Sequence, residues 1–166
     1  AISPSRTLFL VASKSGGTIE VMSLFAHFWK LVTKAKGSHG GRQFVAITDP
    51  GTGLEKMAQD YGFGQIFSNP ADIGGRYSVL SLFGLVPAAL LGLDITRLLD
   101  RAAGMAERCR QQEDTKANPG AYLGAVMGSL AKTGRDKVTV ITSPALAAFG
   151  LWVEQLLAES TGKEGT

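Results

Sequence analysis

The sequence is poor in the residue types that most often form disulfides and metal centres. Its 166 residues include one cysteine, Cys109, and two histidines, His27 and His39. A single cysteine excludes an internal disulfide and fits a reducing, cytoplasmic compartment. The three side chains have no close spacing, so we expect no metal site and no cofactor held by one. We expect both histidines to be surface or packing residues, and Cys109 to lie among charged residues of a helix without a nucleophilic role.

The sequence also lacks a long run of charges of one sign and a long uninterrupted apolar run. The 17 lysines and arginines are mixed with 14 aspartates and glutamates, which gives a net charge of +3. Because no basic face with interleaved aromatic residues is visible, we expect no nucleic-acid partner. The longest uncharged run covers 77–93 and is broken by Gly84, Pro87 and Gly92. Such a run is typical of a buried helix pair with a bend, so we expect no membrane span.

What is present is enough apolar material for a folded domain, since hydrophobic residues make up 45% and charged residues 19%. Short apolar runs alternate with stretches of helical periodicity, which predicts βαβ units, a parallel sheet and the α/β class. The predicted strands are 8–12, 44–47 and 65–67, and the predicted helices between them are 19–36 and 54–61. Further along, the pattern predicts helices over 77–91, 95–112 and 122–132, a strand over 138–141 and a helix over 146–159.

The loop after the first predicted strand has the composition of an anion site. It reads Ser13-Lys14-Ser15-Gly16-Gly17-Thr18 and leads directly into a predicted helix. The first turn of a helix carries unpaired backbone N–H groups and the positive end of the helix dipole. Three hydroxyl groups lie in the loop, and Lys14 adds a charge or points to solvent. The alternative is an ordinary Ser/Thr helix cap, with Glu20 supporting the first turn.

A second unusual stretch is Asp72-Ile73-Gly74-Gly75-Arg76-Tyr77-Ser78. Its two glycines permit close approach of the backbone, and Arg76 follows where a helix is predicted to start. Such an arginine presents a permanently charged fork to an anion. The alternative is a structural arginine that holds a carbonyl group or the neighbouring Asp72.

Together these stretches resemble glucose-6-phosphate isomerases. The first loop alone is similar to the wider group of sugar isomerase (SIS) domains, whereas Gly-Gly-Arg-Tyr-Ser is similar to the signature of the isomerase itself. A third stretch, from Trp152 to Lys163, resembles a segment of the second SIS domain of that family. The chain is also similar to the isomerase half of bifunctional transaldolase–isomerase fusions.

The resemblance implies roles for particular residues. Ser13, Lys14 (through its backbone), Ser15 and Thr18 would hold the substrate phosphate. Arg76 would be the catalytic residue that stabilises the negative charge of the enediolate, and Gly75 would let the sugar approach the backbone. The reaction would interconvert glucose 6-phosphate and fructose 6-phosphate, without a cofactor, in a homodimer of the parent protein. The rival interpretation is a non-catalytic SIS module that senses a phosphosugar, which would share the first loop.

The resemblance also implies a division of the chain into an SIS domain truncated at its N-terminus, a helical connection and the start of a second SIS domain. These regions are 1–92, 93–135 and 136–166. The catalytic glutamate of the family belongs to a Gly-Glu-Pro-type motif, and no such motif occurs in this sequence. We therefore expect a substrate-binding fragment that is inactive by itself.

Overall fold

A computed structural model describes residues 2–111 and 115–162 of the chain. The chain divides into two units, Ala1–Asp94 and Ile95–Thr166. The first unit contains the sheet and both of the unusual stretches identified in the sequence. No helix in the described ranges is long and apolar enough to cross a membrane.

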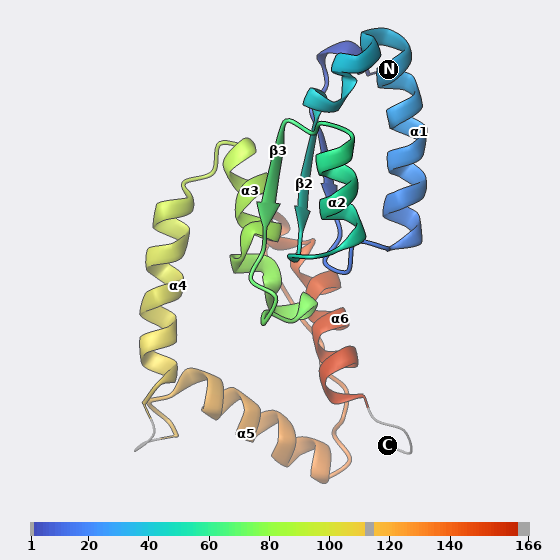
Figure 1. Cartoon of the computed structure of the whole chain (residues 1–166). Coiled ribbons are helices and arrows are strands. Elements are labelled where there is room, and N and C mark those ends of the chain that lie inside the picture. Colours follow the sequence, from blue (N-terminus) through green and yellow to red (C-terminus); the bar gives the residue numbers. More distant parts are fainter. Residues whose placement is uncertain (1, 112–114, 163–166) are drawn as a thin grey trace. The chain divides into compact units, whose positions relative to one another are not determined.

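The first unit is built on a three-stranded parallel sheet (Figure 1). Its strands are β1 (Phe9–Ala12), β2 (Phe44–Thr48) and β3 (Gln65–Ser68), in that spatial order. The register places Val11 beside Ala46 and Ala46 beside Ile66. The predictions of three strands and of the α/β class are therefore confirmed, with strand ends within one residue of those expected.

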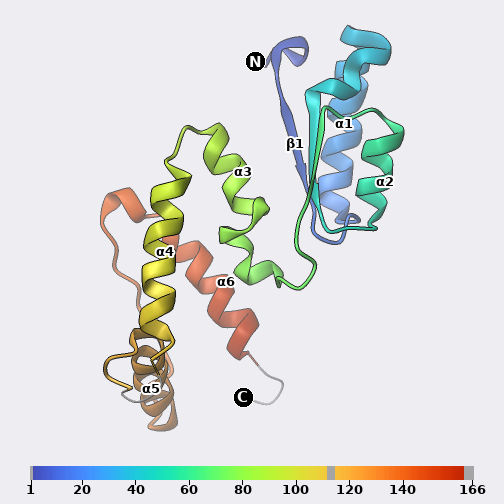
Figure 2. The same ribbon diagram turned by 60° about the vertical axis from the view of Figure 1, so that its left-hand side comes forward.

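Helices cover the sheet on both faces, which explains why every residue of β2 is buried. Helices α1 (Ile19–Lys36) and α2 (Gly53–Asp60) lie on one side of the strands, and α3 (Leu82–Leu90) lies on the other (Figure 2). The predicted helices over 19–36 and 54–61 correspond to α1 and α2.

An aromatic cluster fills the space between the sheet and α1. Phe44, which is fully buried, lies at its centre, with its ring centroid 5.0 Å from that of Phe9 and 5.5 Å from that of Phe25. Trp29 and Phe63 contact the same ring. Because large rings bury much apolar area and pack in stacked, tilted or edge-on pairs, this cluster fixes α1 against β1 and β2.

The first unit also contains three short 3-10 helices: η1 (Pro4–Arg6), η2 (Gly37–Gln43) and η3 (Gly75–Leu80). The helix predicted over 77–91 is wrong at its start, because η3 ends at Leu80 and α3 begins at Leu82. The break lies at Ser81, whose extended backbone interrupts the helix and whose hydroxyl accepts a hydrogen bond from the Phe83 N–H. Ser81 is thus the N-cap of α3.

The second unit is helical in its described part. It contains α4 (Ile95–Cys109), α5 (Pro119–Lys132), the 3-10 helix η4 (Pro144–Leu146) and α6 (Phe149–Thr161). Helix α5 begins three residues earlier than predicted because the Asn118 side chain accepts a hydrogen bond from the Ala121 N–H and caps it. The predicted end of the helix over 95–112 falls at residue 112, which lies outside the described residues.

The strand predicted over 138–141 is wrong for this structure, in which the segment has no regular secondary structure. Its apolar side chains are exposed, to 55% for Val138 and 91% for Ile141. A strand exists only when its backbone pairs with a neighbour, and the described part of the second unit contains no strand to pair with.

Candidate phosphate-binding site

The loop between β1 and α1 lies where the carboxyl ends of the parallel strands meet (Figure 1). The Ser13 N–H donates a hydrogen bond to the carbonyl of Ile47, 3.0 Å away, which continues the pairing of β1 with β2. The Ser13 side chain is 3% exposed, and its hydroxyl oxygen lies 2.9 Å from that of Thr18. A hydrogen bond thus joins the two ends of the loop. Ligands bind at this edge in open α/β sheets as a rule.

The start of α1 is not capped in the ordinary way. Thr18 occupies the N-cap position, but its side chain accepts no hydrogen bond from a backbone N–H of the helix. Its hydroxyl pairs with Ser13 instead. The ordinary Ser/Thr cap is therefore not made, and the first-turn N–H groups have no intrahelical partners. This end of an 18-residue helix attracts an anion through those donors and through the helix dipole.

Gly16 is required by the shape of the loop. Its φ of +72° lies in the left-handed region that side chains disfavour. A Cβ at this position would lie 2.7 Å from Cβ of Thr52 and 3.0 Å from the backbone nitrogen of Leu54. At Gly17 a Cβ would meet nothing within 4 Å. The two adjacent glycines therefore have different roles, and only Gly16 fits the loop against the start of α2.

The Lys14 side chain does not point to open solvent, because its ammonium group already has partners within the protein. Its ammonium group forms an ion pair with the carboxylate of Asp49 and donates a hydrogen bond to the carbonyl of Ala71, 3.2 Å away. The Lys14 carbonyl accepts a hydrogen bond from the Asp49 N–H. Because the side chain is occupied, a direct contact of this residue with phosphate would use its backbone N–H.

Arg76 and Gly75 lie in η3, in the same unit as the loop. The guanidinium carbon of Arg76 is 5.9 Å from the ring centroid of Tyr77, within the range of a cation–π contact. A Cβ added to Gly75 would meet nothing within 4 Å, so the backbone there is open to close approach. Ala71, which accepts from Lys14, lies five residues before Arg76 and links the segment to the loop.

The sequence patterns missed several residues that shape this edge of the sheet. Asp49 follows β2 directly, but no motif in the sequence marked it. Asn69, which is 1% exposed, follows β3 and accepts a hydrogen bond from the Leu82 N–H through its side chain. The available signal was positional, since polar residues immediately after parallel strands lie at the same edge of the sheet.

Other reactive side chains of the chain are His27, Cys109, Glu159 and Lys163. The His27 ring packs against Phe28, with centroids 5.1 Å apart, and Cys109 is exposed. Glu159 accepts a hydrogen bond from Gln155 on the same helix, 2.9 Å away, and Lys163 lies outside the described residues. No group of three or more His, Cys, Asp or Glu side chains that could hold a metal ion occurs within 2–111 and 115–162.

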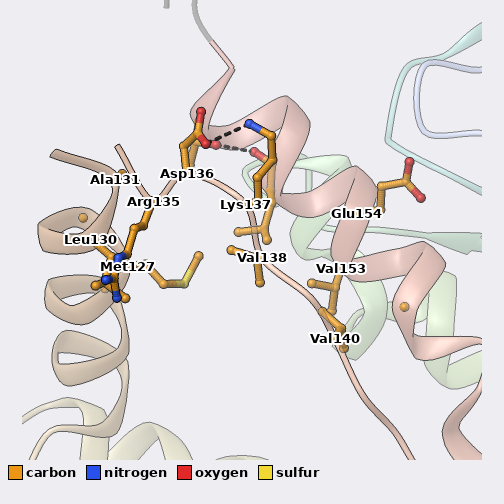
Figure 3. Close-up of a pocket in the computed structure, with 15 residues that line it drawn as sticks. Met127, Leu130, Ala131, Arg135, Asp136, Lys137, Val138, Val140, Val153 and Glu154 are labelled. Atoms are coloured by element: carbon orange, nitrogen blue, oxygen red, sulfur yellow. Dashed lines mark hydrogen bonds and ion pairs between the residues drawn. The ribbon is translucent and has the colours of Figure 1, made fainter. Parts of the chain in front are cut away.

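The second unit has an open, mainly apolar groove of about 960 Å³ between α5 and α6 (Figure 3). Val138 and Val140 line it, together with Met127 of α5 and Val153 of α6. At its rim Lys137 donates a hydrogen bond to the exposed Asp136, and this bond lowers the pKa of the Asp136 carboxyl.

Known proteins resemble this chain over nearly all of its length. The family model for phosphoglucose isomerase matches residues 1–166. A glucose-6-phosphate isomerase of Carboxydothermus hydrogenoformans is 35% identical over 98% of the chain and 35% of its own length. One from Rubrobacter xylanophilus is 38% identical over 99% of the chain and 38% of its own length.

Solved structures agree with the fold. A hypothetical protein from Thermus thermophilus has a TM-score of 0.87 and 29% identity, over 98% of this chain and 38% of that one. A glucose-6-phosphate isomerase from Chlamydia trachomatis has a TM-score of 0.79 and 26% identity, over 98% of this chain and 31% of that one. The chain thus spans a little over a third of the length of the curated relatives described above. With its sheet, its loop and its matches in agreement, the chain belongs to the phosphoglucose isomerase family.

Proposed function

We propose that this chain is the phosphosugar-binding part of a glucose-6-phosphate isomerase, an aldose–ketose isomerase. The observation that carries the proposal is the start of α1, where the Ser13 and Thr18 hydroxyls lie 2.9 Å apart beside uncapped helix N–H groups. The phosphate of glucose 6-phosphate or fructose 6-phosphate would accept hydrogen bonds from Ser13, Ser15 and Thr18 and from the backbone of Lys14. Binding at this point would fix the sugar relative to η3.

Arg76 would supply the charge that the chemical step requires. Isomerisation removes a proton from C2 of the aldose and returns one to C1, through a cis-enediolate whose oxygens carry negative charge. A fixed cation aimed at developing charge is usually a large contribution to catalysis. Gly75, whose surroundings are open, would admit the sugar next to the backbone. The proton itself would move through the glutamate of a Gly-Glu-Pro-type motif, which this sequence does not contain.

The proposal extends to the organisation of the chain. Residues 1–92 would form an SIS domain, 93–135 a helical connection, and 136–166 the start of a second SIS domain. The exposed apolar segment 138–141 supports the last assignment, because its side chains suit the interior of a parallel sheet. The parent protein would be a cytoplasmic homodimer.

Calorimetric titration tests the phosphate site directly. Fructose 6-phosphate and 6-phosphogluconate are titrated into the chain and into its Ser13→Ala and Thr18→Ala variants. Each variant is expected to weaken binding, by about tenfold for the loss of a hydrogen bond to a charged group. Ser5→Ala, a substitution in η1 away from the loop, is the matched control and is expected to leave affinity unchanged.

Two outcomes would contradict the proposal. Equal affinity in the wild type and in both loop variants would remove the phosphate from this loop. Phosphosugar binding without isomerase activity in a family-length protein that carries this segment would favour the non-catalytic sensor.

A further inference from the structure

Lys14 connects the three loops that follow the strands of the sheet. It lies in the loop after β1, forms an ion pair with Asp49, the first residue after β2, and donates to the carbonyl of Ala71, three residues after β3. One side chain therefore connects three segments that approach the candidate site separately. The segment after β3 is the one that leads to Arg76.

The surroundings of the ion pair make it stronger than an ordinary surface pair. The side chains of Lys14 and Asp49 are 29% and 15% exposed. The Lys137–Asp136 pair of the second unit, in contrast, is 90% and 63% exposed. Partly buried pairs are screened less by water and salt, whereas exposed pairs contribute little. Removing one partner of a partly buried pair also leaves the other charge uncompensated.

The charge of Asp49 matters because it lies beside a loop suited to anions. An uncompensated carboxylate at this edge would repel a phosphate group, whereas its pairing with Lys14 removes that repulsion. The Lys14 backbone is also held by the end of β2, since its carbonyl accepts from the Asp49 N–H at 3.3 Å and from the Thr48 hydroxyl at 3.5 Å. The residue is thus fixed at both its main chain and its side-chain end.

We propose that Lys14 is a positioning residue, whose ammonium group holds the segment after β3, and with it Arg76, in place relative to the phosphate loop. Lys14 acts through Asp49 and Ala71 and does not itself contact substrate through its side chain. The consequence for Arg76 rests on the proposed function, whereas the connection between the loops does not.

Hydrogen exchange without ligand tests the connection itself. Lys14→Met is expected to raise amide exchange over 70–80 several-fold, since this segment then loses the hydrogen bond from Lys14 to Ala71, and to leave α1 protected. Asp49→Asn, which keeps the bond to Ala71, is expected to give a smaller rise in the same segment. Lys14→Arg is expected to restore protection, and Lys137→Met is the matched control with no effect. Unchanged exchange over 70–80 in Lys14→Met would overturn the proposal. It would also be overturned if Lys14→Met and Asp49→Asn both raised exchange throughout α1 as much as over 70–80.

A double-mutant cycle with fructose 6-phosphate tests the consequence for Arg76. Arg76→Ala is expected to weaken binding by about tenfold in the wild type but by less than about twofold in Lys14→Met, because Arg76 is then already misplaced. Equal effects of Arg76→Ala in both backgrounds would overturn the positioning role. If the wild type binds no sugar phosphate, the proposed function fails, and the exchange measurement still decides whether Lys14 joins the three loops.

Discussion

The hydroxyl oxygens of Ser13 and Thr18 lie 2.9 Å apart, although one side chain is buried and the other is exposed. Ser13 is 3% exposed at the end of β1, whereas Thr18 stands at the start of α1. The two hydroxyl groups therefore differ in what they can bond to when this hydrogen bond is broken. Thr18 can turn to water, whereas Ser13 has little access to it.

This difference predicts an asymmetry in stability. Thr18→Val leaves the buried Ser13 hydroxyl without its partner and is expected to lower the free energy of unfolding by about 1–3 kcal/mol. Ser13→Ala leaves only an exposed hydroxyl and is expected to cost about 1 kcal/mol or less. Urea denaturation of the two variants measures the difference, and Thr18→Ser, which keeps the hydroxyl, is the control. A larger loss in Ser13→Ala than in Thr18→Val would contradict this account.

The two glycines of the loop are expected to differ in their tolerance of alanine. Gly16→Ala places a Cβ against Thr52 and Leu54 at a φ of +72° and is expected to destabilise the chain by about 1–3 kcal/mol. Gly17→Ala, at a position with no atom within 4 Å, is expected to change stability by less than about 1 kcal/mol. Thermal unfolding of both variants provides the comparison. Similar melting temperatures for the two would show that Gly16 is not sterically required.

Asn69 is expected to stabilise the passage from β3 to α3. Its side chain accepts from the Leu82 N–H at 3.1 Å and donates to the Pro70 carbonyl at 3.0 Å, in a buried position. Asn69→Ala leaves the partly buried N–H of Leu82 without this acceptor and is expected to cost about 1–3 kcal/mol. Gln59→Ala, which removes an exposed amide from α2, is the control and is expected to have little effect. A neutral Asn69→Ala would place the stability of this junction elsewhere.

The segment 138–141 is expected to respond differently in chains of different length. In this chain Val140 is 42% exposed, so Val140→Asp is expected to change stability by less than about 1 kcal/mol. In a family-length protein, where the segment is proposed to be a strand of a second SIS domain, the same change would bury a charge and cost several kcal/mol. Denaturation of both proteins with and without the substitution tests this. Equal effects in the two would argue against the second domain starting here.

Arg76→Ala is expected to separate binding from chemistry in a family-length isomerase. If Arg76 stabilises the enediolate, its removal lowers kcat by about 10²–10³-fold, with a smaller change in KM. Steady-state kinetics in both directions measure the two constants, and Arg6→Ala in η1 is the control. An unchanged kcat would return Arg76 to a structural role beside Tyr77.

The strands and helices of the first unit were predictable because local patterns and tertiary contacts agree there. Buried strands such as β2 appear in the sequence as continuous apolar runs, and α1 shows a clear helical period. The break at Ser81 was not predictable from periodicity, because the uncharged run continues on both sides of it and its glycines and proline lie further along. The prediction of a strand at 138–141 failed for another reason. Strand formation depends on a partner strand, which the residue pattern of one segment cannot reveal.

The sequence by itself determined the fold class, the loop from Ser13 to Thr18 and the family, because these depend on local residue order. Only the tertiary structure decided how the loop is used. It paired Thr18 with Ser13 instead of the helix backbone, and it placed Asp49 and Ala71, distant in sequence, at the ammonium group of Lys14. The physical reason is that parallel strands bring their carboxyl ends to one edge of the sheet, whatever the length of chain between them.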